Sequence, residues 1–461
     1  MNDASFPGSV FACEIKAAEP TAKPRRPIPR KGASKGHKKA EEIASQRSDR
    51  RPVITGSVPR PPNLLIVGAS GHVAQAFLER WGDRRAQFGR LVLLDQNETM
   101  LKDAYLDHGR LDYEFIRREL NFSNGASSYR SLLRQHQIDL VLDVTDLDTL
   151  PILNATDAAG VSYVNTALND AKRGVAEVVA ALHPKRKQKR KAPHIISSGM
   201  NPGVVNIWVW HGYQHYGAPA EVVHFEYDTS MPVAGWRPMI TWSRKEFLTE
   251  AVWEPTGLVV NGRYKLFPTN SLQHREDLRP TMEPVVRLAS YPRGLLVLHE
   301  ENLKLGRKLG ASSKYIYAIH PRTMDYLDEL WRKRGRVEIT DLELGDNTSV
   351  PLTGSDTIGV CLDYPNKRIY YLHSLANSAV TGTNATCAQV AVGIDAALST
   401  LLAQRLSPRI YFASDLYDTV YRDVVFRSLH VEQFVFEKRK NSLILRRQGP
   451  VVPARPGKGR H

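Results

Sequence analysis

The sequence predicts an α/β protein with a doubly wound parallel sheet and a second, mixed α+β domain. Two observations carry this prediction. Short apolar runs alternate with helical segments between residues 63 and 199, which is typical of parallel strands joined by crossover helices. After Gly199 the apolar runs are separated by turns, as in an antiparallel or mixed sheet. A chain of 461 residues is long enough for two or three domains.

The first domain begins at Asn63, where the apolar run 64–67 predicts a buried strand. The glycine-containing turn 68–74 follows it and leads into a helix that ends near Trp81. Further strands are expected at 91–95, 113–116, 138–144, 161–164 and 194–196, with helices at 148–159 and 169–182.

The second domain is expected at 200–383 and is interpreted as a domain for substrate binding and dimerisation. A short helix opens it at 204–215, and apolar runs at 222–227, 239–242 and 295–299 predict strands. The strongly apolar segment 388–402 predicts a buried helix that returns to the first domain. The first domain therefore comprises 61–199 together with about 384–440.

The formal net charge of +15 is concentrated in three segments. Residues 1–60, 185–191 and 446–461 carry +7, +6 and +5, so the rest of the chain carries −3. Residues 1–60 and 441–461 are predicted to be disordered basic tails, because segments of this composition bury little apolar surface. A basic chain suggests a nucleic-acid partner, but confinement of the charge to tails and one loop argues against it.

Three scattered cysteines exclude a disulfide framework and a zinc knuckle. The first 30 residues lack the apolar stretch of a signal peptide, and no apolar run approaches the ~20 residues of a membrane helix. We therefore expect a cytoplasmic protein with no membrane partner. His211 and His215 are four residues apart on the predicted helix, but no third ligand accompanies them, so no metal is predicted.

The turn after the first strand is a candidate nucleotide site. Its spacing, Gly68-x-x-Gly71-x-x-Ala74, lets backbone N–H groups approach a pyrophosphate at the start of a helix. Asp95 ends the next strand, where a carboxylate accepts a hydrogen bond from a ribose hydroxyl and favours NAD over NADP. The candidate cofactor-binding residues of this region are Gly68, Ser70, Gly71, His72, Val73 and Asp95.

Polar residues also follow the later strands, at the sheet edge where ligands of such folds bind. This edge is where the nicotinamide and the substrate are expected. These candidates are Thr145, Asp146, Asn165, Thr166, Ser198 and Gly199. The whole pattern corresponds to a Rossmann domain that binds NAD.

The turn at 198–203, Ser-Gly-Met-Asn-Pro-Gly, resembles that of the saccharopine dehydrogenase-like group. Later segments are more specifically similar to bacterial homospermidine synthase, and the resemblance spans about residues 62–435 in consistent order. The matching segments are 225–229, 241–243 with Phe247 and Glu250, 297–301, 317–321 and 384–390.

The resemblance implies a redox-neutral transferase with tightly held NAD. Putrescine would lose a hydride to NAD and release ammonia, a second amine would condense with the resulting carbon, and the hydride would return to the new imine. It also implies a homodimer. The chain departs from the pattern in its basic segments, in the short stretch 374–384, and after Thr166, where the region of Asn169 and Asp170 replaces an acidic pocket residue of the family.

The resemblance also implies a role for several pocket residues. Glu226 and Glu250 match acids that bind an amine, and Trp242 matches a tryptophan whose indole holds a cation, a contact worth ~0.5–2 kcal/mol. The remaining catalytic candidates are Asn201, Asp146, His299 and Glu301. Asn201 can hydrogen-bond an amine or the nicotinamide, and Asp146 matches an acid beside the cofactor. His299 and Glu301 match residues of the pocket that could move protons.

Two other functions are compatible with the sequence. The first is reductive condensation of an amine with a carbonyl compound, as in saccharopine and carboxyspermidine dehydrogenases. Its carboxylate substrates would need cations, for which Arg237, Arg244 and Lys245 are candidates. The second is a non-enzymatic NAD-binding protein whose basic arms hold nucleic acid.

Overall fold

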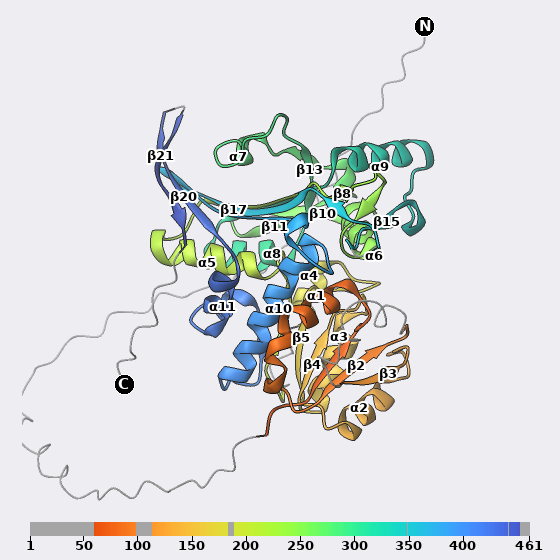
Figure 1. Ribbon diagram of the computed structural model, residues 1–461. Helices are drawn as coiled ribbons and strands as arrows, with labels where there is room; N and C mark the ends of the chain where they lie inside the picture. Colours follow the sequence, from red (N-terminus) through yellow and green to blue (C-terminus); the bar gives the residue numbers. More distant parts are fainter. Residues whose placement is uncertain (1–59, 98–112, 183–188, 348, 441, 452–461) are drawn as a thin grey trace, which may run out of the picture. The chain divides into compact units, whose positions relative to one another are not determined.

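The computed structural model describes residues 60–97, 113–182, 189–347, 349–440 and 442–451. Nearly all of the predicted N-terminal tail and most of the basic loop 185–191 lie outside these residues. The described chain contains two large sheets with helices packed against them (Figure 1). The α/β class predicted from the sequence is confirmed.

The first sheet has seven parallel strands in the order β19-β6-β5-β4-β1-β2-β3. This is the strand order of a dinucleotide-binding fold with one strand added beyond β6. The strands are β1 (Leu64–Val67), β2 (Leu91–Asp95), β3 (Glu114–Arg117), β4 (Leu140–Asp143), β5 (Ser162–Asn165), β6 (His194–Ile195) and β19 (Ile410–Tyr411).

The central strands β1, β2 and β4 are buried on both faces, which explains why they are nearly continuous apolar runs, whereas the edge strand β3 is partly exposed. Leu64 and Ile66 of β1 pack into one core cluster, and Leu65 and Val67 into another. The helices around this sheet are α1 (His72–Trp81), α2 (Ala126–Gln135), α3 (Thr149–Ala158), α4 (Val175–Ala181), α10 (Ala385–Ala403) and α11 (Val420–Ser428).

The second sheet has ten strands and mixed direction, in the order β11-β10-β14-β7-β17-β18-β20-β21, with β12 and β13 attached beside β14. Its strands are β7 (Glu221–Asp228), β10 (Pro255–Val260), β11 (Arg263–Asn270), β12 (Arg275–Asp277), β13 (Arg293–Val297), β14 (Ser312–Ala318), β17 (Ser355–Asp363), β18 (Lys367–Ala376), β20 (Glu432–Arg439) and β21 (Ser442–Pro450).

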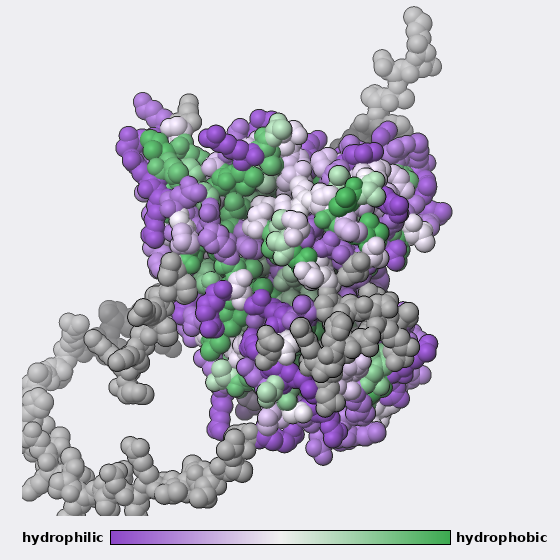
Figure 2. Space-filling view, viewed as in Figure 1, coloured by the Kyte–Doolittle hydropathy of each residue, from purple (hydrophilic) through white to green (hydrophobic). Residues whose placement is uncertain are grey.

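Four short strands form two further pairs, β9 (Met239–Ile240) with β15 (Glu343–Leu344) and β8 (Met231–Pro232) with β16 (Leu352–Thr353). The helices of this part are α5 (Val204–Tyr216), α6 (Arg244–Leu248), α7 (Arg279–Met282), α8 (Glu300–Leu309) and α9 (Pro321–Arg334). Hydrophobic residues gather at the upper left of Figure 2, in the region where Figure 1 labels β21 and α7. Leu372 of β18 and Leu443 of β21 are partly buried and pack against a core cluster of this sheet.

The chain's last elements differ from the prediction. Residues 442–450 were expected in a basic tail, but they form β21, which pairs with β20 along its length. Arg446 of β21 contacts Glu437 of β20, so its charge is balanced across the strand pair. The predicted extension of the first domain to about residue 440 is also wrong beyond 431, because β20 pairs with β18 of the second sheet.

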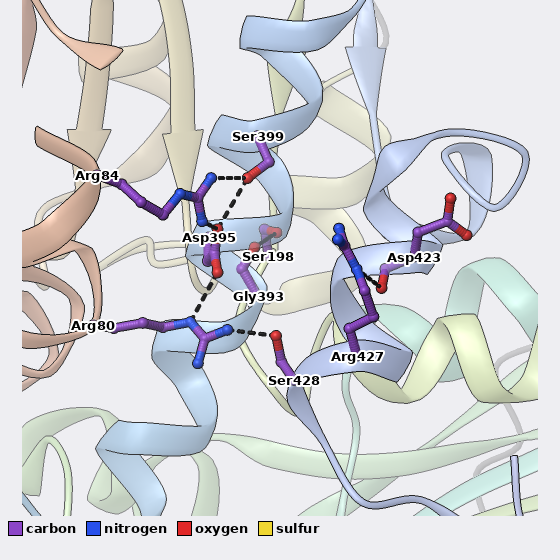
Figure 3. A network of polar contacts seen from close by, with 9 residues as sticks. All are labelled: Arg80, Arg84, Ser198, Gly393, Asp395, Ser399, Asp423, Arg427 and Ser428. Carbon is purple, nitrogen blue, oxygen red and sulfur yellow. Dashed lines mark hydrogen bonds and ion pairs between the residues drawn. The ribbon is translucent and has the colours of Figure 1, made fainter. Parts of the chain in front are cut away.

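The helix predicted at 388–402 is α10, and it packs against α1 of the first domain. The carboxylate of Asp395 on α10 accepts hydrogen bonds from Arg80 Nε at 2.9 Å and from Arg84 Nη1 at 2.5 Å (Figure 3). It also accepts one from Ser399 Oγ at 2.9 Å. Burial raises the pKa of Asp395, but the two arginines outweigh it and hold the pKa below its usual value. Contrary to the sequence expectation, α10 is long and apolar enough to cross a membrane, but it is mostly buried inside the protein, as core helices are.

Candidate active site

A cavity of about 530 Å³ lies between the carboxyl ends of the first sheet's strands and the second sheet. It takes side chains from both sheets and from α6, so residues far apart in the sequence meet in it. Thirteen of the predicted site residues line it: Gly68, Gly71, Val73, Asp95, Thr145, Asp146, Thr166, Gly199, Asn201, Glu226, Trp242, Glu250 and His299.

The cofactor end of the cavity is built by the turn after β1. Gly68 has a φ of +80°, and a Cβ atom there would lie 2.8 Å from Thr145 Cγ2. Only glycine fits this position, which brings the backbone close to the strand-end residues. Gly71 precedes α1, whose first N–H groups have no partner within the helix and point to where a pyrophosphate would bind.

Asp95 and Arg118 also line the cofactor end of the cavity. The carboxylate of Asp95 accepts backbone N–H bonds from Ser70 at 2.9 Å and Asn97 at 3.0 Å, which fixes its position at the cavity wall. The backbone N–H of Arg118 donates to the carbonyl of Asp95 at 2.8 Å, and Arg118 also lines the cavity.

Four cofactor candidates do not line the cavity. Asn165 accepts the N–H of Ser197 and donates to Ala167, and Ser198 donates to the carbonyl of Gly393 at 2.9 Å, so both hold backbone together. The Ser70 hydroxyl donates to the carbonyl of Asn97. His72 begins α1 with a half-buried ring, whose pKa is lowered by burial.

Glu226 lies at the deep end of the cavity on β7 and is 5% exposed. The Tyr315 hydroxyl donates to its Oε2 atom at 2.9 Å, and Asn201 Nδ2 donates to the same atom at 3.3 Å. Burial raises its pKa to about 7, against the opposing effect of these two donors. A cation placed here would ionise this acid fully.

Trp242 follows β9 and presents its ring to the cavity. Its Nε1–H donates to the Tyr317 hydroxyl at 3.1 Å, and its ring meets Phe247 edge-on at 6.4 Å. Tyr317 in turn stacks on Tyr315. The orientation of the indole is therefore fixed by one hydrogen bond and one aromatic contact.

His299 lies between two acids. Its Nε2 atom is 2.9 Å from Glu250, and its Nδ1 atom is 3.3 Å from Glu301. Burial alone lowers the pKa of His299, but Glu250 and Glu301 raise it well above its usual value, which favours the protonated ring. Glu301 does not line the cavity: it lies fully buried behind His299, and its pKa, which burial raises, is held low by that ring.

The position of Glu250 depends on an irregular turn. It lies in the π-helical segment η4 (Thr249–Trp253) that follows α6, a distortion found often at functional sites. The sequence signal for it was only its distance from Trp242.

Several cavity residues were missed by the sequence analysis. Tyr315 and Tyr317 look like ordinary alternating residues of a strand, and Glu246 looks like a surface acid in the first turn of a helix. For Glu246, the only sequence signal was Ser243 three residues before it, because a serine followed by a glutamate at this spacing predicts the start of a helix, here α6. Asn169, noted only as a departure from the family pattern, also lines the cavity.

The basic residues near Trp242 do not enter the cavity. Arg237 contacts Glu343 at 3.4 Å, Arg244 donates to the carbonyl of Leu342 at 3.1 Å, and Lys245 contacts Asp146 at 3.1 Å. Among the described residues that line the cavity, Arg118 at the cofactor end is the only arginine or lysine.

His299, Glu300 and Glu301 offer three ligand atoms within 4.8 Å of one another. Both ring nitrogens of His299 already face carboxylates, which suits an ion pair and its proton better than a metal ion. The prediction that no metal is used stays a prediction.

Comparison with known proteins supports the fold. The family profile of the saccharopine dehydrogenase NADP binding domain matches residues 64–192. The structure is similar to that of homospermidine synthase from Legionella pneumophila, solved in complex with NAD, with a TM-score of 0.64 and 16% identity over 80% of this chain and 90% of that one. No curated protein matches the sequence.

Two further solved structures are similar only with TM-scores below 0.5. They are an amine dehydrogenase from Mycobacterium smegmatis (0.34, 10% identity, 77% of this chain and 95% of that one) and a myo-inositol dehydrogenase from Lactobacillus casei (0.37, 13% identity, 86% and 98%). The protein thus has a saccharopine dehydrogenase-like dinucleotide-binding domain and a fold similar to homospermidine synthase, as the sequence predicted.

Proposed function

We propose that this protein is an NAD-dependent transferase that moves the aminobutyl group of putrescine to a second amine, with release of ammonia. The observation that carries the proposal is the charge of the cavity. Glu226, Glu246 and Glu250 line its substrate end, where no described lysine or arginine does. Burying a dication there requires such acids, because an unpaired buried charge is prohibitively costly.

The residues at the cofactor end fit NAD. The Gly68 turn and the start of α1 would hold the pyrophosphate, and Asp95 would bind the ribose hydroxyls and repel a 2′-phosphate. Bound NAD would supply the capacity to take a hydride from the amine-bearing carbon and return it later. The NAD found with the structurally similar homospermidine synthase supports this choice.

The substrate end supplies binding and proton transfer. Glu226 would bind one ammonium group with Tyr315 and Asn201 beside it, and the Trp242 face would lie against the cationic carbon–nitrogen centre. His299, held positive by Glu250 and Glu301, can give a proton to the departing amine and recover one from the attacking amine. One carbon–nitrogen bond breaks and one forms, with no net oxidation.

Purified protein with catalytic NAD and excess putrescine tests the proposal. We expect a new polyamine by mass spectrometry, one ammonia released per product, and no net change in NADH absorbance. Trp242→Ala should reduce this activity strongly. The proposal is wrong if neither putrescine, spermidine nor diaminopropane gives a new polyamine or ammonia.

Reductive condensation remains the second candidate, because the matching family profile is that of saccharopine dehydrogenase. The same assay with an amine, a keto acid and NADH separates the two. Stoichiometric NADH consumption would favour condensation. The positions of Arg237, Arg244 and Lys245 argue against it, since none of them lines the cavity and each is already engaged with another residue.

A further inference from the structure

The cavity holds an acid that occupies a helix-capping position of α6. Glu246 is the third residue of α6, and Ser243 caps that helix by accepting the Glu246 N–H at 3.2 Å. In a capping box the Glu246 carboxylate would return to the Ser243 N–H. No such bond joins these two described residues, and Glu246 lines the cavity instead.

The Glu246 carboxylate has no compensating cation within ion-pair distance among the described residues. Its neighbour Lys245 turns away and contacts Asp146 at 3.1 Å. Burial and, to a smaller extent, the nearby carboxylate of Glu250 raise the pKa of Glu246 to about 8, against a smaller opposing effect of Lys245. An acid in this environment gains its full charge when a cation arrives.

Asn169 is a second residue of the cavity lining that has an unused hydrogen-bonding atom, and it points to a ligand independently of Glu246. Its side chain is 9% exposed, lines the cavity, and donates through Nδ2 to the Thr145 carbonyl at 3.1 Å. Its Oδ1 atom is buried without a hydrogen-bond partner among the described residues. An unpaired buried acceptor costs about 1–3 kcal/mol, which a donor on a ligand would recover.

The number of acids suits a ligand with two charges. Glu246 lies on α6, and Glu250 lies four residues later in the π-helical segment η4. Glu250 is already paired with His299, and Glu226 is held at the deep end by Tyr315. When one ammonium group is bound at Glu226, Glu246 is still available to bind a second ammonium group. That second group can belong to the same molecule or to the acceptor amine.

We propose that Glu246 and Asn169 form a second ammonium-binding position, which makes the cavity selective for amines with two charged ends over monoamines. This inference rests on the proposed function and names its substrate class. Glu246 and Asn169 are specificity-determining residues in it: they select the substrate, and the reacting carbon stays near Trp242.

Calorimetric titration of the full chain saturated with NADH tests the inference, because NADH cannot accept a hydride and turnover is blocked. The probes are 1,4-diaminobutane and n-butylamine. Wild-type protein should prefer the diamine at least about tenfold. Glu246→Gln should weaken diamine binding about tenfold or more and change butylamine binding less than about twofold, while Asn169→Ala should give a smaller loss of the same selectivity.

Glu329→Gln is the control, since Glu329 is an exposed acid of α9, pairs with Lys333 and does not line the cavity. It should retain wild-type selectivity, and NADH affinity should be unchanged in every variant. Equal weakening of both amines by Glu246→Gln overturns the inference alone. A wild-type protein that binds no amine at all overturns the proposed function and the inference with it.

Discussion

The indole N–H of Trp242 donates a hydrogen bond to the hydroxyl of Tyr317, with the two atoms 3.1 Å apart. Trp242 comes from the segment after β9 and Tyr317 from β14, so the bond joins two parts of the chain that meet only in the folded protein. It holds the face of the indole toward the cavity. The proposed cation site therefore depends on a tyrosine as well as on the tryptophan.

Replacing Tyr317 with phenylalanine should loosen Trp242 while keeping the aromatic contact with Phe247. A neutral hydrogen bond is worth about 0.5–1.5 kcal/mol, so we expect KM for putrescine to rise about twofold to tenfold, with a smaller effect on kcat. Steady-state kinetics measures both. Tyr364→Phe, which removes a remote hydrogen bond to Gly217, is the control. Unchanged kinetics in Tyr317→Phe would show that packing alone orients the indole.

Amine binding should improve as pH rises through neutrality. Burial raises the pKa of Glu226 to about 7, so this acid is mostly protonated below that pH and cannot pair with an ammonium group. The charged groups that act on it are Asp228 and His299, besides the donors Tyr315 and Asn201. We expect kcat/KM for putrescine to fall about tenfold per pH unit below about 6. A flat profile between pH 5 and 8 contradicts the assignment of Glu226.

Replacing Glu301 with glutamine should shift the alkaline limit of activity. Glu301 and Glu250 together raise the pKa of His299, so loss of one carboxylate moves the pKa down toward its usual value. The ring would then lose its proton at a lower pH. The alkaline limb in the pH profile of kcat should be displaced to lower pH. An unmoved limb would mean that His299 is not the group that titrates.

Gly68→Ala should abolish or greatly weaken NAD binding. The φ of +80° strains any residue with a Cβ atom, and that atom would overlap Thr145 Cγ2. We expect at least a tenfold loss of affinity in a fluorescence titration with NADH. Gly160→Ala carries a similar strain, with a φ of +76°, but its Cβ would meet nothing. If both variants bind NADH equally, the turn does not form the cofactor site.

Asp395→Asn should destabilise the fold. The buried carboxylate pairs with Arg80 and Arg84, and removing one partner of a buried pair costs about 3–5 kcal/mol, less here because both arginines are partly exposed. Its lowered pKa means that this stability is present above the usual aspartate pKa and is lost as pH falls through the folded value. Urea unfolding measures the change. Asp423→Asn, whose partner Arg422 is adjacent in sequence, should change stability by less than about 1 kcal/mol.

The first sheet could be predicted because its strands are buried on both faces and are therefore continuous apolar runs, as at Leu64–Val67. The cavity's main acids came from the family resemblance, since Glu226 and Glu250 alone resemble surface residues. β21 was missed because its exposed side chains, such as Arg446, give it the composition of a tail. Asn165 and Ser198 were expected at the cofactor but do not line the cavity, because the side-chain direction at a strand's end depends on its neighbours, here Ser197 and Gly393.

The chain passes between the two sheets more than once. Strands β1–β6 belong to the first sheet and β7–β18 to the second or its small neighbours; β19 then joins the first and β20–β21 the second. A single cut in the backbone thus cannot separate two self-contained halves. A fragment ending near residue 199 would lack β19 and would lack α10, which packs against α1. The remaining fragment would contain α10 without the α1 surface that it packs against. The protein should therefore tolerate gene splitting poorly, and its cofactor and substrate ends should unfold together.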